Sequence, residues 1–498
     1  MDILSLEFLV FLLITVAAYY FVNLINKCFK KQIIPQWLVL LIGSIVFYGF
    51  CHWIYLVFLF SSAAVSYIAS LLSNKKKGIS KTAMILAIVI NVGTLATLKY
   101  CNFFINSVNS VFHANWLTQN FIIPLGISFY TFSLVAYNVD CYKNGSAIEK
   151  NPLKFLLFVS YFPKILQGPI SSYEQLNSDG LFKEHSFVDN NYLQSFYRIA
   201  VGLIKKIVIA NIINLYVNSA YANLDNTYGL QLAVVAILYA IQLYADFSGF
   251  LDISIGVSGL FGIRLEENFD APYLSTSIQD FWRRWHITLG AWLRKYIYIP
   301  LGGNRVGVLR WIINVLVVWL ISGIWHGANW TFVLWGLYHG VLLIITGLAT
   351  QIKKKNGADI SKKESNIFFT MLKVCWTFLL VTLGWILFRS SSVKEAARYV
   401  WHMVKVWQAS SYQLFSDSSL SEATPFLFIA FLFIAILIGA YVIKRYSDVL
   451  SLKIKRYELV STILKYAFVI VCFSYAIFAF FYTKSIGGGE SSFIYFDF

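Results

Sequence analysis

The sequence has few charged residues, and acidic ones are especially scarce. Only 13% of its 498 residues are Asp, Glu, Lys or Arg, and 24 acidic residues stand against 40 basic ones. Hydrophobic residues make up 58% of the chain, and the mean hydropathy is +0.66. An ordinary soluble domain is excluded by this composition. We therefore predict a polytopic membrane protein.

Cysteine is also scarce, and no two cysteines form a C-x-x-C pair, so neither a disulfide framework nor a metal cluster is predicted. The six cysteines are Cys28, Cys51, Cys101, Cys141, Cys375 and Cys472. The N-terminus lacks the positive region and the cleavage site of a secretory signal peptide. The first apolar run, residues 8–25, is instead predicted to cross the membrane, because about 18 helical residues span a hydrocarbon core of roughly 30 Å.

Basic residues gather in short connectors between apolar runs, which argues against nucleic acid binding. Further apolar runs cover residues 33–50, 51–72, 82–98, 119–140, 199–222, 229–263, 309–349, 367–388, 425–443 and 464–482. The positive-inside rule places the basic connectors, near residues 27–31, 75–77, 353–363 and 444–456, in the cytoplasm.

This topology predicts that both termini are extracytoplasmic. It also places the amphipathic stretch within Ser390 to Thr424 along the outer surface of the membrane. No tandem or inverted repeat is evident. We predict one membrane domain over residues 1–482 and an extracytoplasmic tail over residues 483–498.

Two aspartates stand within the apolar run 229–263. Charged side chains are rare inside membrane spans, where they mark functional sites or buried networks. Gln242 and Asp246 are four residues apart, as are Ser248 and Asp252, so each pair shares a helix face. The residues alone favour a packing role as interhelical hydrogen bonds, with substrate binding as the alternative.

The segment from Asp280 to Arg305 mixes arginine and lysine with tryptophan and tyrosine. This composition is typical of a segment that lies at or dips into the cytoplasmic interface. Arg283 and Arg284 are suited to the phosphates of coenzyme A or phosphopantetheine, while anchoring to anionic lipid explains them equally well. We expect the basic neighbour of His286 to favour a neutral imidazole.

The apolar run 309–349 is long enough to need a break, and Gly323 and Gly327 around His326 are the expected place. Backbone freed at a break is buried in protein or lines a watered cavity, which places His326 at a cavity wall. We expect Asn329 to share its face, and His339 to point away from it on a continuous helix. General base catalysis, a structural hydrogen bond and a proton relay all remain compatible with His326 at this point.

Five stretches, taken together and in order, resemble the membrane-bound O-acyltransferase family and, within it, the branch of bacterial alginate O-acetyltransferase membrane subunits. They are PLGISFYTFSLVAYNVDCY (124–142), YFPKILQGPI (161–170), DFSGFLDISIG (246–256), ENFDAPYLSTSIQDFWRRWHITLGAWLRKYIYIPLGGNR (267–305) and GIWHGANWTFVLWGLYHG (323–340). The motifs are long and specific, and the resemblance covers nearly the whole chain.

The resemblance implies an all-α fold of many membrane helices around a central funnel, with re-entrant or interfacial helices. It implies that His326 of the WHG motif is catalytic and that His286 of the RRWH motif contributes to activity. The predicted substrate-binding residues are Arg283, Arg284, Trp325, Asn329, Asp246 and Asp252.

The chain ends in three glycines, Gly487 to Gly489, and the aromatic sequence FIYFDF. In the resembling branch, a motif similar to FIYFQF implies a tyrosine that carries the acyl group, which corresponds to Tyr495. Asp497 stands here where glutamine is more usual. An interfacial aromatic anchor is the alternative.

The expected reaction moves an acyl group, expected to be acetyl, from a cytoplasmic thioester across a bacterial cell membrane for O-acylation of an extracellular or envelope polysaccharide. The donor is expected to be acetyl-CoA or an acyl carrier protein, and the recipient an extracytoplasmic acyltransferase partner. No tightly bound cofactor is expected. The alternatives are D-alanyl transfer to teichoic acid, a proton-coupled transporter that uses the same histidines and aspartates, and a scaffold of a secretion complex.

Overall fold

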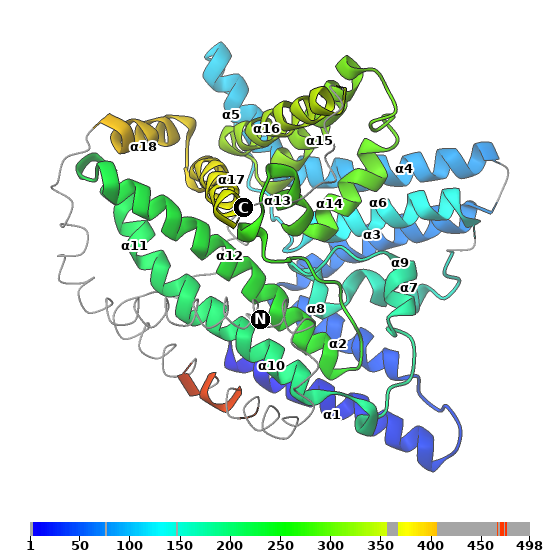
Figure 1. Ribbon diagram of the computed structural model, residues 1–498. Helices are drawn as coiled ribbons and strands as arrows, with labels where there is room; N and C mark the ends of the chain where they lie inside the picture. The colour runs from blue at the N-terminus through cyan, green and yellow to red at the C-terminus, as the bar shows by residue number, and fades with distance from the viewer. Residues whose placement is uncertain are drawn as a thin grey trace. The chain divides into compact units, whose positions relative to one another are not determined.

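The computed structural model describes residues 3–74, 77–145, 148–355, 367–405, 466, 469–472, 474 and 475. Throughout these residues the regular elements are helices, with one isolated bridge between Phe269 and Trp285. Helices follow one another along the chain in Figure 1. The prediction of an all-α fold is confirmed.

Within the described residues, eight helices are long and apolar enough to cross a membrane. They are Leu6–Cys28, Trp53–Leu72, Lys77–Phe112, Tyr192–Ala222, Gly229–Leu260, Val308–His326, Trp330–Ile352 and Phe368–Arg389. The predicted run 425–443 and most of the run 464–482 lie outside the described residues. The multi-span character predicted from hydropathy is confirmed.

The predicted run 119–140 starts too early. The helix there begins only at Ile127 and continues to Lys143. Pro124 lacks a backbone N–H, and Gly126 has a positive φ of 73°, a conformation that favours glycine. These two residues keep the backbone before Ile127 out of the helix.

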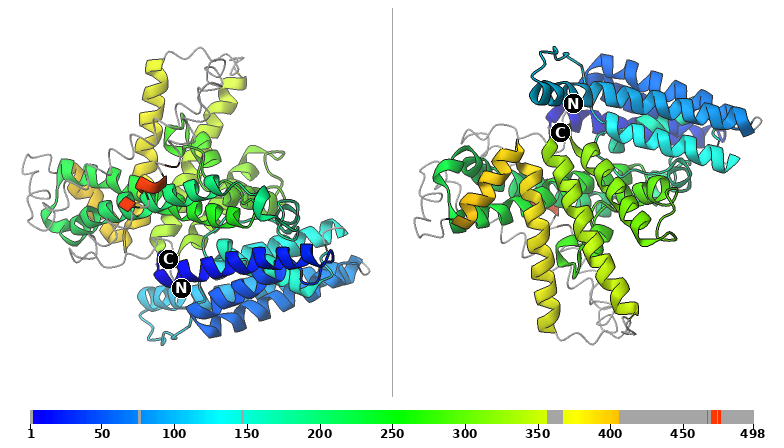
Figure 2. Two further views of the ribbon diagram at one scale, coloured as in Figure 1. Left: turned by 90° about the horizontal axis from the view of Figure 1, so that it is seen from below. Right: turned by 90° about the horizontal axis from the view of Figure 1, so that it is seen from above.

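The chain divides into two compact units. Unit 1 comprises Met1–Ser195, Ser254–Glu267 and Ile287–Gly303. Its helices are α1 (Leu6–Cys28), α2 (Gln36–Cys51), α3 (Trp53–Leu72), α4 (Lys77–Leu95), α5 (Cys101–Phe112), α6 (Ile127–Lys143), α7 (Pro152–Ser160), α8 (Phe162–Ile165), α9 (Tyr173–Ser178) and α14 (Ile287–Leu293). Helices α3, α4 and α6 pack on one another, and α2 packs on α1, α3 and α7 (Figure 2).

The spans of unit 1 bury polar side chains and expose apolar ones. Asn91 of α4 is buried and its amide donates to the Ser66 hydroxyl of α3 at 2.9 Å. On the same helix, Leu86 and Val89 are exposed. This inside-out pattern fits a lipid environment, where helices associate through small and polar residues.

Unit 2 comprises Phe196–Ile253, Asn268–His286 and Asn304–Phe498. Its helices are most of α10 (Tyr192–Leu203), α11 (Asn211–Ala222), most of α12 (Gly229–Leu260), α13 (Ile278–Arg284), α15 (Val308–His326), α16 (Trp330–Lys355), α17 (Ile367–Arg389) and α18 (Val393–Lys405). Helix α16 packs on α13, α15 and α17. Both views of Figure 2 show α16 and α17 side by side.

Glycines bring α15 and α16 together. A Cβ on Gly323 of α15 would lie 2.3 Å from the Phe332 carbonyl oxygen, and one on Gly336 of α16 would lie 2.3 Å from the Trp319 carbonyl oxygen. Such distances are shorter than any real side-chain contact. The two backbones therefore approach as closely as small residues permit in helix pairs of membrane proteins.

The amphipathic stretch after Ser390 is helical, as its pattern predicts. Helix α18 buries Tyr399, whose hydroxyl donates to the Leu232 carbonyl at 2.7 Å. Its opposite face exposes Trp401 and Val404. Residues 406–424 lie outside the described residues, and the placement of this stretch at the outer surface stays a prediction.

Candidate active site

The predicted break in the apolar run 309–349 is confirmed. Helix α15 ends at His326, Gly327 is extended, and α16 begins at Trp330. A Cβ on Gly327 would lie 2.2 Å from the Phe332 ring, so only glycine fits there. His326 is buried, with 5% of its surface exposed, at the C-terminal end of its helix.

One expectation about this break is wrong. Asn329 does not share a helix face with His326, because the helix has already ended. Its side-chain oxygen instead accepts from the Thr331 N–H at 3.1 Å, which caps α16, and its amide donates to the Ser391 carbonyl at 2.8 Å. Substrate binding by Asn329 stays a prediction, but its amide is already engaged in positioning the loop.

Aromatic rings surround His326. The ring centroids of Trp325 and Trp335 each lie 5.0 Å from that of His326, and Phe388 lies at 5.3 Å. Trp325, predicted to bind substrate, is thus adjacent to the imidazole. A desolvated setting of this kind strengthens any electrostatic interaction made by the imidazole.

His286 follows a short helix and has strained backbone. Ser277 caps α13 by accepting from the Asp280 N–H, and the helix ends at Arg284. His286 has a positive φ of 48°, which is uncommon for a residue with a side chain and is concentrated at functional sites. The imidazole is only 2% exposed, and Nδ1 lies 3.4 Å from the Asn268 side-chain oxygen.

The expected neutral form of His286 is confirmed, although for a different reason. Burial lowers the pKa of His286 to about 3. The basic neighbour Arg284 pairs with Asp280 at 3.1 Å instead. The low dielectric around the ring, not a nearby positive charge, therefore keeps the imidazole neutral.

The two predicted histidines lie in the same place. The ring centroids of His286 and His326 are 6.3 Å apart, and Trp325 lies 5.9 Å from His286. Because Nδ1 of His286 faces the amide oxygen of Asn268, Nδ1 carries the proton and Nε2 carries the lone pair. Within the described residues, His286 Nε2 is buried without a hydrogen-bond partner. The arrangement offers one imidazole as a general base and a second as a hydrogen-bond acceptor.

The two predicted aspartates are paired with cations that the sequence analysis did not single out. Asp246 lies 2.6 Å from Lys206 Nζ, with both side chains at most 2% exposed. Asp252 lies 2.6 Å from Lys205 Nζ and 2.5 Å from Arg198 Nε. The two lysines stand on a π-helical stretch, Ile204–Ala210, inside an apolar run. Lysines in such a run are themselves a signal of a buried site.

The remaining predicted residues are two arginines at the end of α13 and Tyr495. Arg283 is exposed on α13, and Arg284 is committed in part to Asp280. Phosphate binding by either stays a prediction. Tyr495 lies outside the described residues. In the part of the chain that the structure describes, no group of three His, Cys, Asp or Glu side chains is arranged to hold a metal ion.

His339 is linked to the site through a shared aromatic neighbour, and its separation from His326 stays a prediction. The expectation assumed a continuous helix, and the break at Gly327 removes that assumption. Trp335 contacts both histidines, with ring centroids 5.0 Å from His326 and 5.2 Å from His339. Trp282 also lies 4.8 Å from His339. His339 is thus part of the aromatic packing behind His326.

Comparison with known proteins decides the family. Residues 149–370 match the sequence profile of the membrane-bound O-acyltransferase family. The chain is 33% identical over 421 residues to the peptidoglycan O-acetyltransferase of Helicobacter pylori. The aligned region covers 78% of this chain and 77% of that protein. The chain belongs to the membrane-bound O-acyltransferase family.

Two further relatives align with smaller shares of the chain. The probable alginate O-acetylase AlgI of Pseudomonas putida is 34% identical, over 68% of this chain and 69% of that protein. The teichoic acid D-alanyltransferase of Bacillus subtilis is 30% identical, over 54% of this chain and 69% of that protein. His286 and His326 both fall within the matched residues 149–370. The protein is therefore an O-acyltransferase of the membrane.

Proposed function

We propose that this protein transfers an acetyl group from a cytoplasmic thioester to hydroxyl groups of an extracellular or cell-envelope polysaccharide in a bacterial cell membrane. The buried pair His286 and His326 is the observation that carries the proposal. The names of the relatives support the acceptor, since those with high coverage act on peptidoglycan or alginate.

The proposed reaction needs a general base and a substrate hydroxyl that is held in position. His326 removes the proton from an attacking hydroxyl, the oxygen bonds to the thioester carbon, and the carbon–sulfur bond breaks. The resulting imidazolium returns the proton to the departing thiolate. The lone pair on His286 Nε2 accepts a hydrogen bond from a substrate hydroxyl and so orients it. Arg283 and Arg284 bind the phosphates of the donor, acetyl-CoA or a carrier protein.

The first acceptor in this proposal is Tyr495, and its support comes from the sequence. A free phenol has a pKa of about 10 and is a weak nucleophile at neutral pH, so it needs a base. The glycines Gly487 to Gly489 provide a hinge for the tail. A phenyl ester then passes the acetyl group to an extracytoplasmic partner that acts on the polysaccharide. Both termini are extracytoplasmic in this arrangement.

D-alanyl transfer to teichoic acid is the second candidate, because a D-alanyltransferase is among the relatives. Its match covers only 54% of this chain, against 78% for the peptidoglycan enzyme. The acyl group on the labelled donor, acetyl or D-alanyl, distinguishes the two candidate functions. A protein that accepts D-alanine from a carrier protein and ignores acetyl-CoA would support the second candidate.

The test uses membranes that contain the full-length protein, incubated with isotopically labelled acetyl-CoA. Label is followed on the C-terminal peptide by mass spectrometry and on extracted polymer. We expect His326→Ala to lower labelling of both by a factor of about 100 or more, the usual contribution of a general base. Tyr495→Phe should remove the label from the peptide and from the polymer.

The matched control is His113→Ala, which removes an exposed histidine. It should leave labelling unchanged. Normal labelling in His326→Ala at equal membrane abundance would overturn the proposed role of His326. Polymer labelling that survives in Tyr495→Phe would show direct transfer and leave the tail as an interfacial anchor.

A further inference from the structure

The span Lys77–Phe112 of unit 1 is longer than a membrane requires. Its 36 residues form a helix of roughly 54 Å at about 1.5 Å per residue, whereas the hydrocarbon core is about 30 Å thick. Helix α4 and the π-helical turn that follows it, Ala96–Tyr100, together cover roughly 36 Å. Helix α4 packs on α3 and α6, so α4 is the part that crosses the core. Helix α5 therefore lies beyond the core.

The chain changes direction at this π-helical turn. Figure 1 shows α5 pointing away from the line of α4. None of the 12 residues of α5 is buried. The helix ends at His113, which has a positive φ of 49°, and the segment 114–123 after it is neither helix nor strand. We call residues 101–123 the arm, and residues 114–123 its returning segment.

Two asparagines of α5 hold the returning segment alongside the helix. The Asn102 amide donates to the Gln119 carbonyl at 2.7 Å, and its side-chain oxygen accepts from the Gln119 N–H at 2.9 Å. Asn109 makes the same pair of bonds with Trp116, at 2.8 and 3.0 Å. The two asparagines are seven residues apart and so share one face of the helix. The arm is therefore a folded element with a defined shape.

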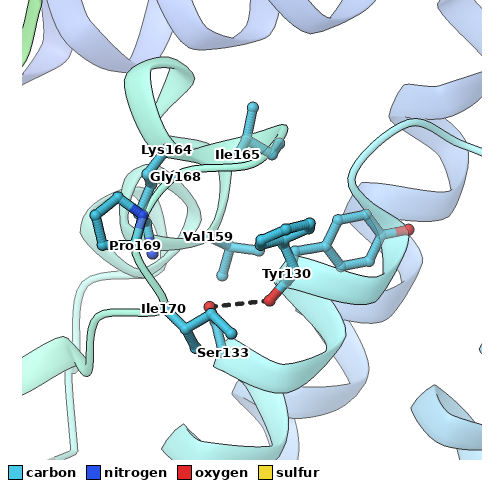
Figure 3. A pocket seen from close by; sticks show the side chains of 9 residues that line it. Tyr130, Ser133, Val159, Lys164, Ile165, Gly168, Pro169 and Ile170 are labelled. Atoms are coloured by element: carbon cyan, nitrogen blue, oxygen red, sulfur yellow. Dashed lines mark hydrogen bonds between the residues drawn. The ribbon is translucent and has the colours of Figure 1, made fainter. Parts of the chain in front are cut away.

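The end of the arm is fixed in the interior of unit 1. Gly126 has a φ of 73°, and a Cβ there would lie 2.2 Å from the Ile165 carbonyl oxygen. From Ile127 the chain continues as α6, whose Tyr130 and Ser133 line, with Ile165, a cavity that has room for about one water molecule (Figure 3). Packed structure thus precedes and follows the arm, while α5 itself buries none of its residues.

The arm exposes apolar side chains and carries no charge. Phe104, Val108 and Val111 are spaced by four and three residues, which places them on one face of α5. No Asp, Glu, Lys or Arg occurs in residues 101–123. The most exposed apolar side chains of the arm are between 59% and 82% exposed, and they are Phe104, Val111, Phe112, Trp116 and Leu117.

These features fit one environment, the interface layer of the membrane. The hydrocarbon core excludes irregular backbone such as the returning segment. In water, so many exposed apolar side chains would form an aggregation-prone patch. Amphipathic helices with exposed aromatic residues lie instead at the boundary between headgroups and acyl chains. Helix α4 leads to the arm with a lipid-facing stripe of its own, in which Ile85, Val89 and Val92 are exposed.

We propose that the arm lies in the interface layer, with its apolar side chains among the upper parts of the lipid chains and its exposed Asn106 and Ser110 toward water. Its binding partner is the lipid surface itself. Because the arm carries no charge, zwitterionic lipid is sufficient for this contact. The positive-inside rule places residues 75–77 in the cytoplasm, so the leaflet is the extracytoplasmic one. The inference does not depend on acyl transfer.

The experiment measures tryptophan fluorescence of the full-length protein in phosphatidylcholine nanodiscs. The signal of Trp116 is the difference between the wild type and Trp116→Phe. Three quenchers are compared: lipid brominated near the headgroup, lipid brominated near the middle of the bilayer, and acrylamide in the water. Trp376 is the matched reference, because it is 62% exposed against 61% for Trp116 but stands near the middle of the span α17. Its signal is isolated with Trp376→Phe.

We expect the shallow bromines to quench Trp116 more strongly than the deep ones, and the order to be reversed for Trp376. Leu117→Asp adds a charge next to Trp116, so Trp116 should lose its quenching by lipid and gain quenching by acrylamide. Asn120→Asp is the matched control, since it adds the same charge at a position that is polar and exposed, and it should leave the profile of Trp116 unchanged. Replacing phosphatidylcholine by phosphatidylglycerol should also change nothing.

Four results would overturn the inference. Quenching of Trp116 by acrylamide and by neither lipid would place the arm in water, where its apolar face would suit a protein partner. Quenching that matches Trp376 in depth would place it in the core. Equal profiles in Leu117→Asp and Asn120→Asp, or quenching only with phosphatidylglycerol, would also contradict it. His326→Ala should keep the wild-type profile, which separates this inference from the proposed function.

Discussion

The imidazole rings of His286 and His326 lie 6.3 Å apart, centroid to centroid, with an angle of 60° between their planes. Each ring stands where regular helix stops, His326 on the last residue of α15 and His286 two residues beyond α13. Helix ends leave backbone N–H and C=O groups without intrahelical partners, so the backbone near both rings differs from that of a helix interior. The two imidazoles thus come from two separate helix ends and meet in one buried place.

The buried neutral state of His286 predicts a loss of stability in acid. Its pKa is lowered from 6.5 to about 3 by burial, so between these values the unfolded chain binds the proton and the folded protein does not. Stability therefore falls as the pH drops below 6.5. From pH 7.5 to pH 5.5 the contribution of this one group is about 1.4 kcal/mol.

Chemical unfolding of the wild type and of His286→Gln at both pH values checks this prediction. The variant should lose about 1.4 kcal/mol less than the wild type over the interval. His326 is the titratable side chain that faces His286, so His326→Gln is measured in parallel to separate its contribution. An unchanged pH dependence in His286→Gln would contradict the assignment of a buried, neutral imidazole.

The ion pair between Lys206 and Asp246 predicts a second, larger effect on stability. Both side chains are almost fully buried, and their charged atoms are 2.6 Å apart. Lys206→Met leaves the carboxylate without this partner and should destabilise the protein by about 3–5 kcal/mol. The double variant Lys206→Met with Asp246→Leu removes both charges and should recover most of that loss. Denaturant unfolding in detergent measures each variant.

The control for the buried ion pair between Lys206 and Asp246 is an ion pair on the surface. Arg398 and Asp225 are 43% and 75% exposed, so Arg398→Ala should change stability by less than about 1 kcal/mol. Acetyl transfer by the double variant decides the role of Asp246. Retained transfer would make the pair a packing element, as the sequence alone favours, and lost transfer in a stable protein would support substrate binding by Asp246.

Much of the site was predictable because the signals were local. Glycines flanking His326 mark the break, and the aspartates of α12 stand out in an apolar run. The ion pairs between residues far apart in the sequence were not predictable. Lys206 and Asp246 are 40 residues apart, and no periodicity within one helix shows which partner a charged group meets. The role of Asn329 as a cap was missed because helix spacing was applied beyond the end of the helix.

The approach of α15 to α16 predicts that Gly336→Ala lowers both activity and stability. The added methyl group would lie 2.3 Å from the Trp319 carbonyl oxygen, so the helices must separate and His326 must shift with them. Overpacking of this kind typically costs about 1–3 kcal/mol. Gly307→Ala is the control, since a Cβ at the start of α15 meets nothing within 4 Å. Equal transfer rates in the two variants would show that the crossing does not position His326.

The contact between Asn268 and His286 predicts a change in the pH dependence of catalysis. The Asn268 side-chain oxygen lies 3.4 Å from His286 Nδ1 and favours the neutral tautomer that donates from Nδ1, which leaves the Nε2 lone pair for the substrate. Asn268→Asp places a carboxylate there, which raises the pKa of His286 toward or above its ordinary value. Protonation then removes the Nε2 lone pair, so transfer should fall as the pH is lowered through that raised pKa. The wild type should show no such acid limb from His286, because its pKa is about 3.

Initial rates of acetyl transfer between pH 5.5 and 8.5, the range around the ordinary histidine pKa of about 6.5, test this prediction. Asn268→Leu is the companion variant, because it removes the hydrogen-bond acceptor without adding charge. It should lower the rate at every pH while keeping the wild-type profile. If Asn268→Asp shows the same pH profile as Asn268→Leu, the side chain of Asn268 does not control the protonation of His286, and a purely structural role for the contact follows.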